Sequence, residues 1–189
     1  MKKLFIMSLI VMTSACSSLS EKVIARSDGL SSRPDWAKET VSYFEKDGMS
    51  NFVGTQVIDG AMNTTWVCTA AANMAKKEVS DTVKQKLDFI VQGANEDMSV
   101  GMAQLKYVGT EASNISLSNL RKDGCYWEKV VTQASVDDKQ VLYRAFVKMS
   151  MPTQQLKDAI KKAGMKRGLS KEFQKQVDER WEVTTKAEE

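Results

Sequence analysis

The chain has 189 residues, with 27 lysines and arginines against 24 acidic residues and a formal net charge of +3. This length suffices for one ordinary domain with tails, and so small a net charge gives no sign of a nucleic-acid partner. The chain contains no histidine, which excludes Ser-His-Asp and Cys-His nucleophilic catalysis and histidine metal ligands.

The first fifteen residues have the order of a secretory signal. Lys2 and Lys3 form a positive start, residues 4–12 form an apolar run, and small residues precede Cys16. The run is too short to span a bilayer, which needs about 20 apolar residues. We expect residues 1–15 to be removed. Because this takes Lys2 and Lys3 from the 27 basic residues, 25 remain against 24 acidic ones, and the mature chain is near +1.

Cys16 has two interpretations. An ordinary signal peptidase could cut nearby and leave Cys16 incidental, or the cysteine could carry lipid. The stretch before it is similar to a bacterial lipobox in Ser14 and Ala15 and departs from it at Thr13, where leucine is usual. The polar stretch after it favours lipidation at Cys16, and two acyl chains already suffice for stable attachment. Ser17 stands where an aspartate would signal inner-membrane retention, which favours the outer membrane, facing the periplasm.

The segment before the first apolar pattern reads as a linker. Residues 16–33 are rich in serine and charge and predict a lipidated tether, with a loose helix over residues 21–25. Asp35 is placed to cap a helix over residues 36–45, which Gly48 ends. Strand-forming side chains over residues 51–58 predict the first strand.

A long helix is predicted over residues 63–92, because apolar residues recur there at steps of three or four and form one face. These residues are Val67, Ala71, Ala75, Val79, Val83, Leu87 and Ile90. The small residues among them would let the helix lie close to a sheet. Polar residues are assigned to its solvent side: Lys76, Lys77, Glu78, Asp81, Lys84 and Lys86. A second helix is predicted over residues 98–112, and Ile115 and Leu117 are expected to start an extended segment.

The remaining elements are strands and a helical tail. Tyr126, Trp127 and Val130 mark a second strand, and residues 136–139 carry turn chemistry. Residues 141–151 alternate between an apolar and a mixed face, as in a sheet with one buried face. Beyond Pro152, residues 152–189 predict a helical tail. The order indicates a two-layer α+β domain over residues 34–151, with a small antiparallel sheet of about three strands and two longer helices on one face.

Sequence motifs for catalysis are missing, as are glycine-rich phosphate loops. The acidic pairs Glu96-Asp97 and Asp137-Asp138 lie in predicted turns, where acids are usually solvated, so neither is expected to be catalytic. Cys68 and Cys125 are too few for a structural zinc site. An oxidising compartment permits a disulfide between them, and buried free thiols are equally open. We expect no cofactor and no enzyme activity.

Two groups of residues could bind a ligand. Basic residues gather in the tail and could contact an anionic polymer or lipid, although a solvated helix face is the commoner explanation. They are Lys161, Lys162, Lys166, Arg167 and Lys171. The tryptophans could line a pocket for a flat ligand, although such residues more often belong to a core. They are Trp36, Trp66, Trp127 and Trp181.

A family resemblance rests on short motifs spread over residues 34–151. They are Pro34-Asp35-Trp36, Phe52-Val53-Gly54, the alanine-rich residues 70–79, Trp127, and Tyr143-Arg144-Ala145-Phe146-Val147. In their order the chain resembles the LPP-twenty family of bacterial outer-membrane lipoproteins, which includes flagellum-associated members. The departures are Thr13 and the tail beyond Pro152. The resemblance implies an α+β domain, lipid on Cys16, and no known enzyme activity.

The leading functional hypothesis is a non-enzymatic envelope lipoprotein that forms or joins an assembly, as a homo-oligomer or with an envelope partner. A strand over residues 141–151 at a sheet edge, or the helical tail, would offer the contact. The alternative is a periplasmic binder of a small aromatic ligand or an anionic envelope polymer.

Overall fold

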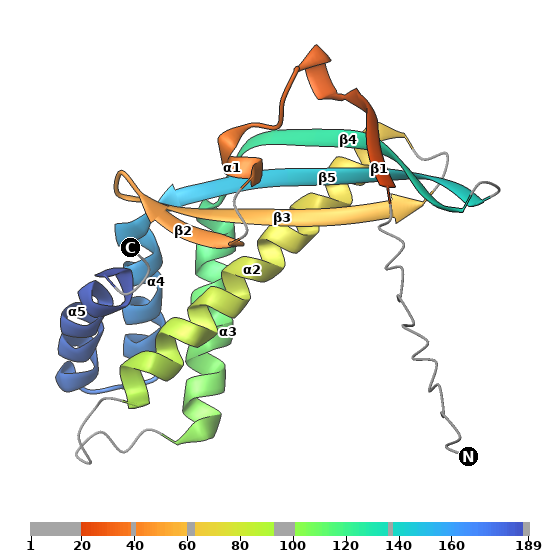
Figure 1. Cartoon of the computed structure of the whole chain (residues 1–189). Coiled ribbons are helices and arrows are strands. Elements are labelled where there is room, and N and C mark those ends of the chain that lie inside the picture. Colours follow the sequence, from red (N-terminus) through yellow and green to blue (C-terminus); the bar gives the residue numbers. More distant parts are fainter. Residues whose placement is uncertain (1–19, 39–40, 60–62, 93–100, 136–137, 187–189) are drawn as a thin grey trace, which may run out of the picture.

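The computed structural model describes residues 20–38, 41–59, 63–92, 101–135 and 138–186, and it contains one sheet with helices on both sides (Figure 1). The elements in chain order are β1 (Ser20–Arg26), η1 (Ser27–Gly29), α1 (Asp35–Lys38), β2 (Tyr43–Lys46), β3 (Met49–Asp59), α2 (Thr64–Gln92), α3 (Met102–Asn119), β4 (Arg121–Ser135), β5 (Asp138–Pro152), α4 (Thr153–Lys166) and α5 (Lys171–Lys186).

The sheet is antiparallel with the strand order β1-β4-β5-β3-β2. The α+β class agrees with the sequence, but the prediction of about three strands is wrong, because the sheet has five. The prediction of an edge position for residues 141–151 is also wrong. These residues belong to β5, which lies at the centre of the sheet between β4 and β3.

The two strands that the sequence analysis missed are the short edge strands. Residues 21–25 are not a loose helix but part of β1, which pairs with β4 through six residue pairs from Ser20↔Gln133 to Arg26↔Glu128. The helix predicted over residues 36–45 is wrong in its second half, where β2 forms. Asp47 and Gly48 have φ values of 53° and 72°. Two left-handed residues make the tight turn of a β-hairpin, so they join β2 to β3 instead of ending a helix.

One face of the sheet is covered by helices α2 to α5 (Figure 1). The long helix predicted over residues 63–92 is confirmed as α2, and all seven residues of its predicted apolar face are buried. Lys86 was wrongly assigned to the solvent side. Its side chain is 6% exposed, and its Nζ lies 3.3 Å from Glu45 Oε1 on β2.

Helix α3 runs to Asn119, so the prediction that Ile115 and Leu117 start an extended segment is wrong. Both residues lie in the last turns of α3, and Leu117 packs against the main apolar cluster. The start of the predicted second helix, residues 98–100, lies outside the described residues.

The C-terminal helices belong to the same core as the sheet. Leu156 and Ile160 of α4 and Phe173, Val177 and Trp181 of α5 are buried in one cluster with Phe52 of β3 and residues of α2 and α3. The helices predicted in residues 152–189 are therefore present, and they complete the helical layer over the sheet. The folded unit extends beyond residues 34–151 at both ends.

The other face of the sheet is covered only in part, by the short helix α1. Ala37 of α1 is buried with Tyr126 of β4 and Phe146 of β5, and Trp36 packs against them. Among the described residues, no helix combines the length and the apolar character needed to cross a membrane.

Candidate functional site

The lipidation site expected at Cys16 lies outside the described residues. The other two cysteines are joined. Cys68 of α2 and Cys125 of β4 form a disulfide with Cα atoms 6.0 Å apart. Both pack against an apolar cluster that contains Val67, Ala71 and Val147, so the bond ties the start of the long helix to the sheet.

The basic residues of the tail are largely engaged in helix packing. Lys161 lies 2.5 Å and Lys157 lies 2.9 Å from Asp178 Oδ1, which links α4 to α5. Hydrogen bonds from these two lysines lower the pKa of Asp178. Lys166 donates to Glu111 of α3, and this hydrogen bond raises the pKa of Lys166.

Arg167 lies over the Tyr107 ring, with Cζ 3.0 Å from its centroid. Lys162 and Lys171 are exposed. The contacts of Lys161, Lys166 and Arg167 therefore favour a structural role for most of this group.

The four tryptophans do not converge. Trp36 of α1 packs on the face of the sheet opposite α2 to α5, whereas Trp127 packs on the face that those helices cover. Trp181 is 5% exposed in the main core, and Trp66 is 50% exposed near the start of α2. These positions place no two of the four in one ligand pocket.

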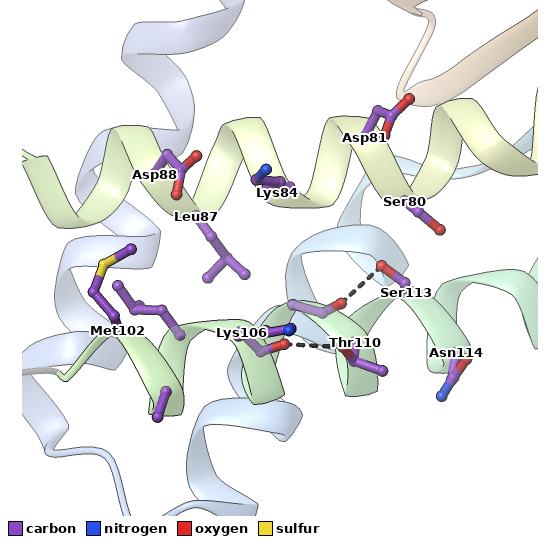
Figure 2. Close-up of a pocket in the computed structure, with 13 residues that line it drawn as sticks. Ser80, Asp81, Lys84, Leu87, Asp88, Met102, Lys106, Thr110, Ser113 and Asn114 are labelled. Atoms are coloured by element: carbon purple, nitrogen blue, oxygen red, sulfur yellow. Dashed lines mark hydrogen bonds between the residues drawn. The ribbon is translucent and has the colours of Figure 1, made fainter.

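A groove of about 690 Å³ runs between α2 and α3 (Figure 2). Leu87 lines it from α2, and the flexible side chain of Met102, 82% exposed, lines it from α3. The hydroxyls of Thr110 and Ser113 donate to carbonyl oxygens of their own helix, Lys106 and Gly109, at 2.9 and 2.7 Å. These two hydroxyls are therefore bonded within α3 and do not supply the convergent polar groups that a specific small-molecule site requires.

A buried charged network lies on the face of the sheet opposite α2 to α5. Glu128 of β4 is 2% exposed, and its carboxylate accepts hydrogen bonds from Arg33 Nη2 at 2.6 Å and from Tyr126 Oη at 2.9 Å. Arg26 Nε lies 3.8 Å from Glu128 Oε1. Burial disfavours the charged carboxylate, but the hydrogen bonds from Arg33 and Tyr126 outweigh it and lower the pKa of Glu128.

The same network raises the pKa values of Tyr126 and Arg33. Burial and the hydrogen bond to Glu128 raise the pKa of Tyr126, and the bond to Glu128 raises that of Arg33. The Arg33 guanidinium also lies 4.7 Å from the centroid of the Phe146 ring. Every carboxylate oxygen thus has a donor, and the arrangement fastens the chain after β1 onto the sheet.

The edge of β3 is the described feature most suited to binding another chain. β2 pairs only with residues 49–52, and the Val53 N–H donates to Ser42 O at 2.7 Å. Backbone groups of alternate residues point to the same side of a strand, so Thr55, Val57 and Asp59 present their N–H and C=O groups to that edge. Within the described chain, no strand pairs with this part of the edge.

The side chains along this open edge are accessible. Thr55 and Asp59 are exposed, and Val57 is 45% exposed. The Gln56 side chain donates to the Val57 carbonyl at 3.2 Å, and the Gln140 side chain donates to Asp59 Oδ1 at 2.9 Å. The edge is therefore protected in part by side chains and by one acidic residue, as natural edge strands are.

Neither the buried network nor the open edge was predicted from the sequence. Tyr126, Glu128 and Val130 share one face of β4, so a charged residue between two apolar ones was a readable signal for the buried network. The open edge had no such signal, because it exists only where β2 is shorter than β3.

Metal-ligand side chains do not gather in the described part of the chain. No three acidic or cysteine side chains there come together as a metal site. Glu96-Asp97 and Asp137 of the acidic pairs lie outside the described residues. Comparison with protein-family models, with curated proteins and with solved structures finds no match to this chain, so the likeness to the LPP-twenty lipoproteins stays a prediction.

Proposed function

We propose that the protein is a non-enzymatic envelope lipoprotein, anchored at the outer membrane by lipid on Cys16, that builds an assembly with further copies of itself. The observation that carries the assembly role is the open edge of β3 at residues 54–59. An exposed edge of this kind readily accepts a strand from another chain. Any association with a flagellum, as in members of the LPP-twenty family, belongs to this proposal.

The disulfide supports the envelope location. Disulfides persist in oxidising compartments and are rare in the cytosol, and Cys68 and Cys125 are bonded. A signal-like N-terminus and a disulfide are independent features that agree on export. The lack of histidine removes the commonest proton shuttle near neutral pH, which favours a structural role over catalysis.

Strand directions allow a continuous sheet between copies. Each neighbouring pair in the order β1-β4-β5-β3 is antiparallel, so β1 and β3 run in opposite directions. The β3 edge of one copy can therefore pair antiparallel with the β1 edge of a second copy that has the same orientation. Such a head-to-tail contact generates a ring or a filament.

The lipid anchor strengthens this argument. Anchored copies are confined to two dimensions, which raises their effective concentration, so a weak edge contact would be populated. The lipid also holds every copy on the same side of one membrane.

The test is crosslinking of the full lipidated chain in intact cells, with a Val57→Lys variant. A lysine at this exposed position adds charge to the open edge, and we expect loss of the crosslinked oligomers. Met165→Lys is the matched control, because Met165 is a 60% exposed residue on α4, away from the sheet edges. A strictly monomeric wild type, or equal oligomers in Val57→Lys, would contradict the proposal.

A further inference from the structure

The chain between the lipid and the fold is very short, and this inference rests on the proposed anchor at Cys16. β1 begins at Ser20, which pairs with Gln133, and the next residue, Glu21, pairs with Thr132. Four steps of about 3.8 Å separate the Cα atoms of Cys16 and Ser20, so they lie at most about 15 Å apart. A free tether over residues 16–33 would have allowed roughly 60 Å.

Part of the distance of about 15 Å between Cys16 and Ser20 lies within the headgroup layer. The acyl chains hold Cys16 at the base of the headgroup layer, which is about 5–8 Å thick on each side of the bilayer. Ser20 therefore lies within about 10 Å of the outer boundary of the headgroups. Because Ser20 is held this close to the headgroups, the residues that pair with the start of β1 also lie near them.

The neighbours form what we call the β1 corner, residues 20–22, 131–133 and 139–141. Lys22 pairs with Val131, and Val131 pairs with Val141 on the next strand. Lys22 and Lys139 are exposed, and Val141 is 36% exposed. This mixture of ammonium groups and an apolar side chain suits a headgroup layer, where phosphates and acyl chains are both within reach.

We infer that the β1 corner rests on the lipid headgroups of the leaflet that holds Cys16. Figure 1 shows the start of β1 beside the end of the β4–β5 hairpin, with α4 and α5 at the other end of the sheet. Lys139 and Pro152 are 13 residues apart on β5, which corresponds to roughly 43 Å. With the strands standing upright on the leaflet, the α4–α5 end, including exposed Lys162, lies away from the membrane.

The experiment places a fluorophore at either end of the full lipidated chain through Lys139→Cys or Lys162→Cys. Cys68 and Cys125 are bonded to each other and Cys16 carries lipid, so the dye reacts with the introduced cysteine. The chain is reconstituted in phosphatidylethanolamine and phosphatidylglycerol vesicles whose headgroups carry a short-range nitroxide quencher. We expect most of the Lys139→Cys fluorescence to be lost and that of Lys162→Cys to be retained.

A lengthened linker tests whether the short tether is the cause. Inserting about 12 Gly and Ser residues after Ser18 adds roughly 20 Å of reach, and we expect it to restore much of the Lys139→Cys fluorescence. Equal quenching at both positions, or no effect of the insertion, would overturn the inference. Mass spectrometry of the N-terminal peptide separates the two proposals. An unlipidated Cys16 would refute the anchor, whereas a lipidated chain without quenching at position 139 would refute the β1 corner alone.

Discussion

At the scale of single residues, Glu128 decides how the N-terminal part of the chain joins the sheet. Its buried carboxylate accepts hydrogen bonds from Arg33 and Tyr126 and lies near Arg26, the last residue of β1. A buried charge is costly unless its hydrogen bonds are complete, and these donors more than offset the burial, since the pKa of Glu128 is lowered. The folded state therefore binds this proton more weakly than the unfolded chain does.

This shift has a definite sign in the pH dependence of stability. A carboxyl with a lowered folded-state pKa contributes stability above its unfolded value of about 4.3 and loses it as the pH falls through the folded value. We expect Glu128→Gln to lower the free energy of unfolding by about 2 kcal/mol at pH 7, less than for a fully buried pair because Arg33 can rehydrate. The difference from wild type should shrink below pH about 4.

Urea unfolding of both proteins between about pH 3 and pH 7 measures this difference. This range spans the ordinary glutamate pKa of about 4.3. Asp81→Asn is the control, because Asp81 pairs with Lys77 on the exposed side of α2, and it should behave like wild type. A Glu128→Gln deficit that is the same at every pH would show that the lost contribution is packing and not the carboxylate charge.

At the scale of elements, the backbone of α2 passes very close to that of β3 at Gly54. A Cβ on Gly54 would lie 2.1 Å from the Ala71 carbonyl oxygen and 2.2 Å from the Ala75 nitrogen. Both contacts are with helix backbone, which cannot move aside as a flexible side chain does. The glycine on β3 and the alanines on α2 thus let the two backbones approach closely. This close approach explains why α2 has small residues at this crossing.

Gly54→Ala should therefore be strongly destabilising. Overpacking a core typically costs about 1–3 kcal/mol, and a clash with backbone places this change at about 3 kcal/mol or more. Gly124→Ala on β4 is the matched control, since its Cβ would meet only Trp36 at 3.8 Å, an ordinary contact. Thermal unfolding of the two variants should separate them clearly. Equal melting temperatures would mean that α2 lies farther from β3 than the structure has it.

The elements also show what the sequence could predict and why. α2 and β5 were predicted because each repeats one apolar pattern over many residues. The burial of Val67 to Ile90 follows the α2 pattern, whereas the single buried face predicted for β5 is wrong, because Phe146 and Ser150 of its mixed face are buried as well. β1 and β2 are 7 and 4 residues long, too short to show such a pattern, although Asp47-Gly48 was a readable hairpin signal for β2. Lys86 broke the helix pattern because Glu45, its partner on β2, is distant in sequence.

At the scale of the whole molecule, the anchor limits which sheet edges can meet. Two β3 edges related by a two-fold axis would pair antiparallel and would turn the two molecules end for end. If the β1 corner rests on the membrane, one of the two Cys16 anchors would then point away from the leaflet. Pairing of β3 with β1 of the next copy keeps all copies in the same orientation, because these strands run in opposite directions within one chain.

Crosslinking between defined positions distinguishes these two arrangements. Ile24 on β1 and Val57 on β3 are 49% and 45% exposed, and each can be changed to cysteine in a separate population of lipidated protein. In mixed vesicles, a short bis-maleimide should join Ile24→Cys to Val57→Cys and give few products from either variant alone, because only the head-to-tail contact brings the two edges together. Val57→Cys dimers formed as efficiently without Ile24→Cys would support a two-fold β3 contact, and they would rule out an assembly in which every copy stands on the membrane in the same way.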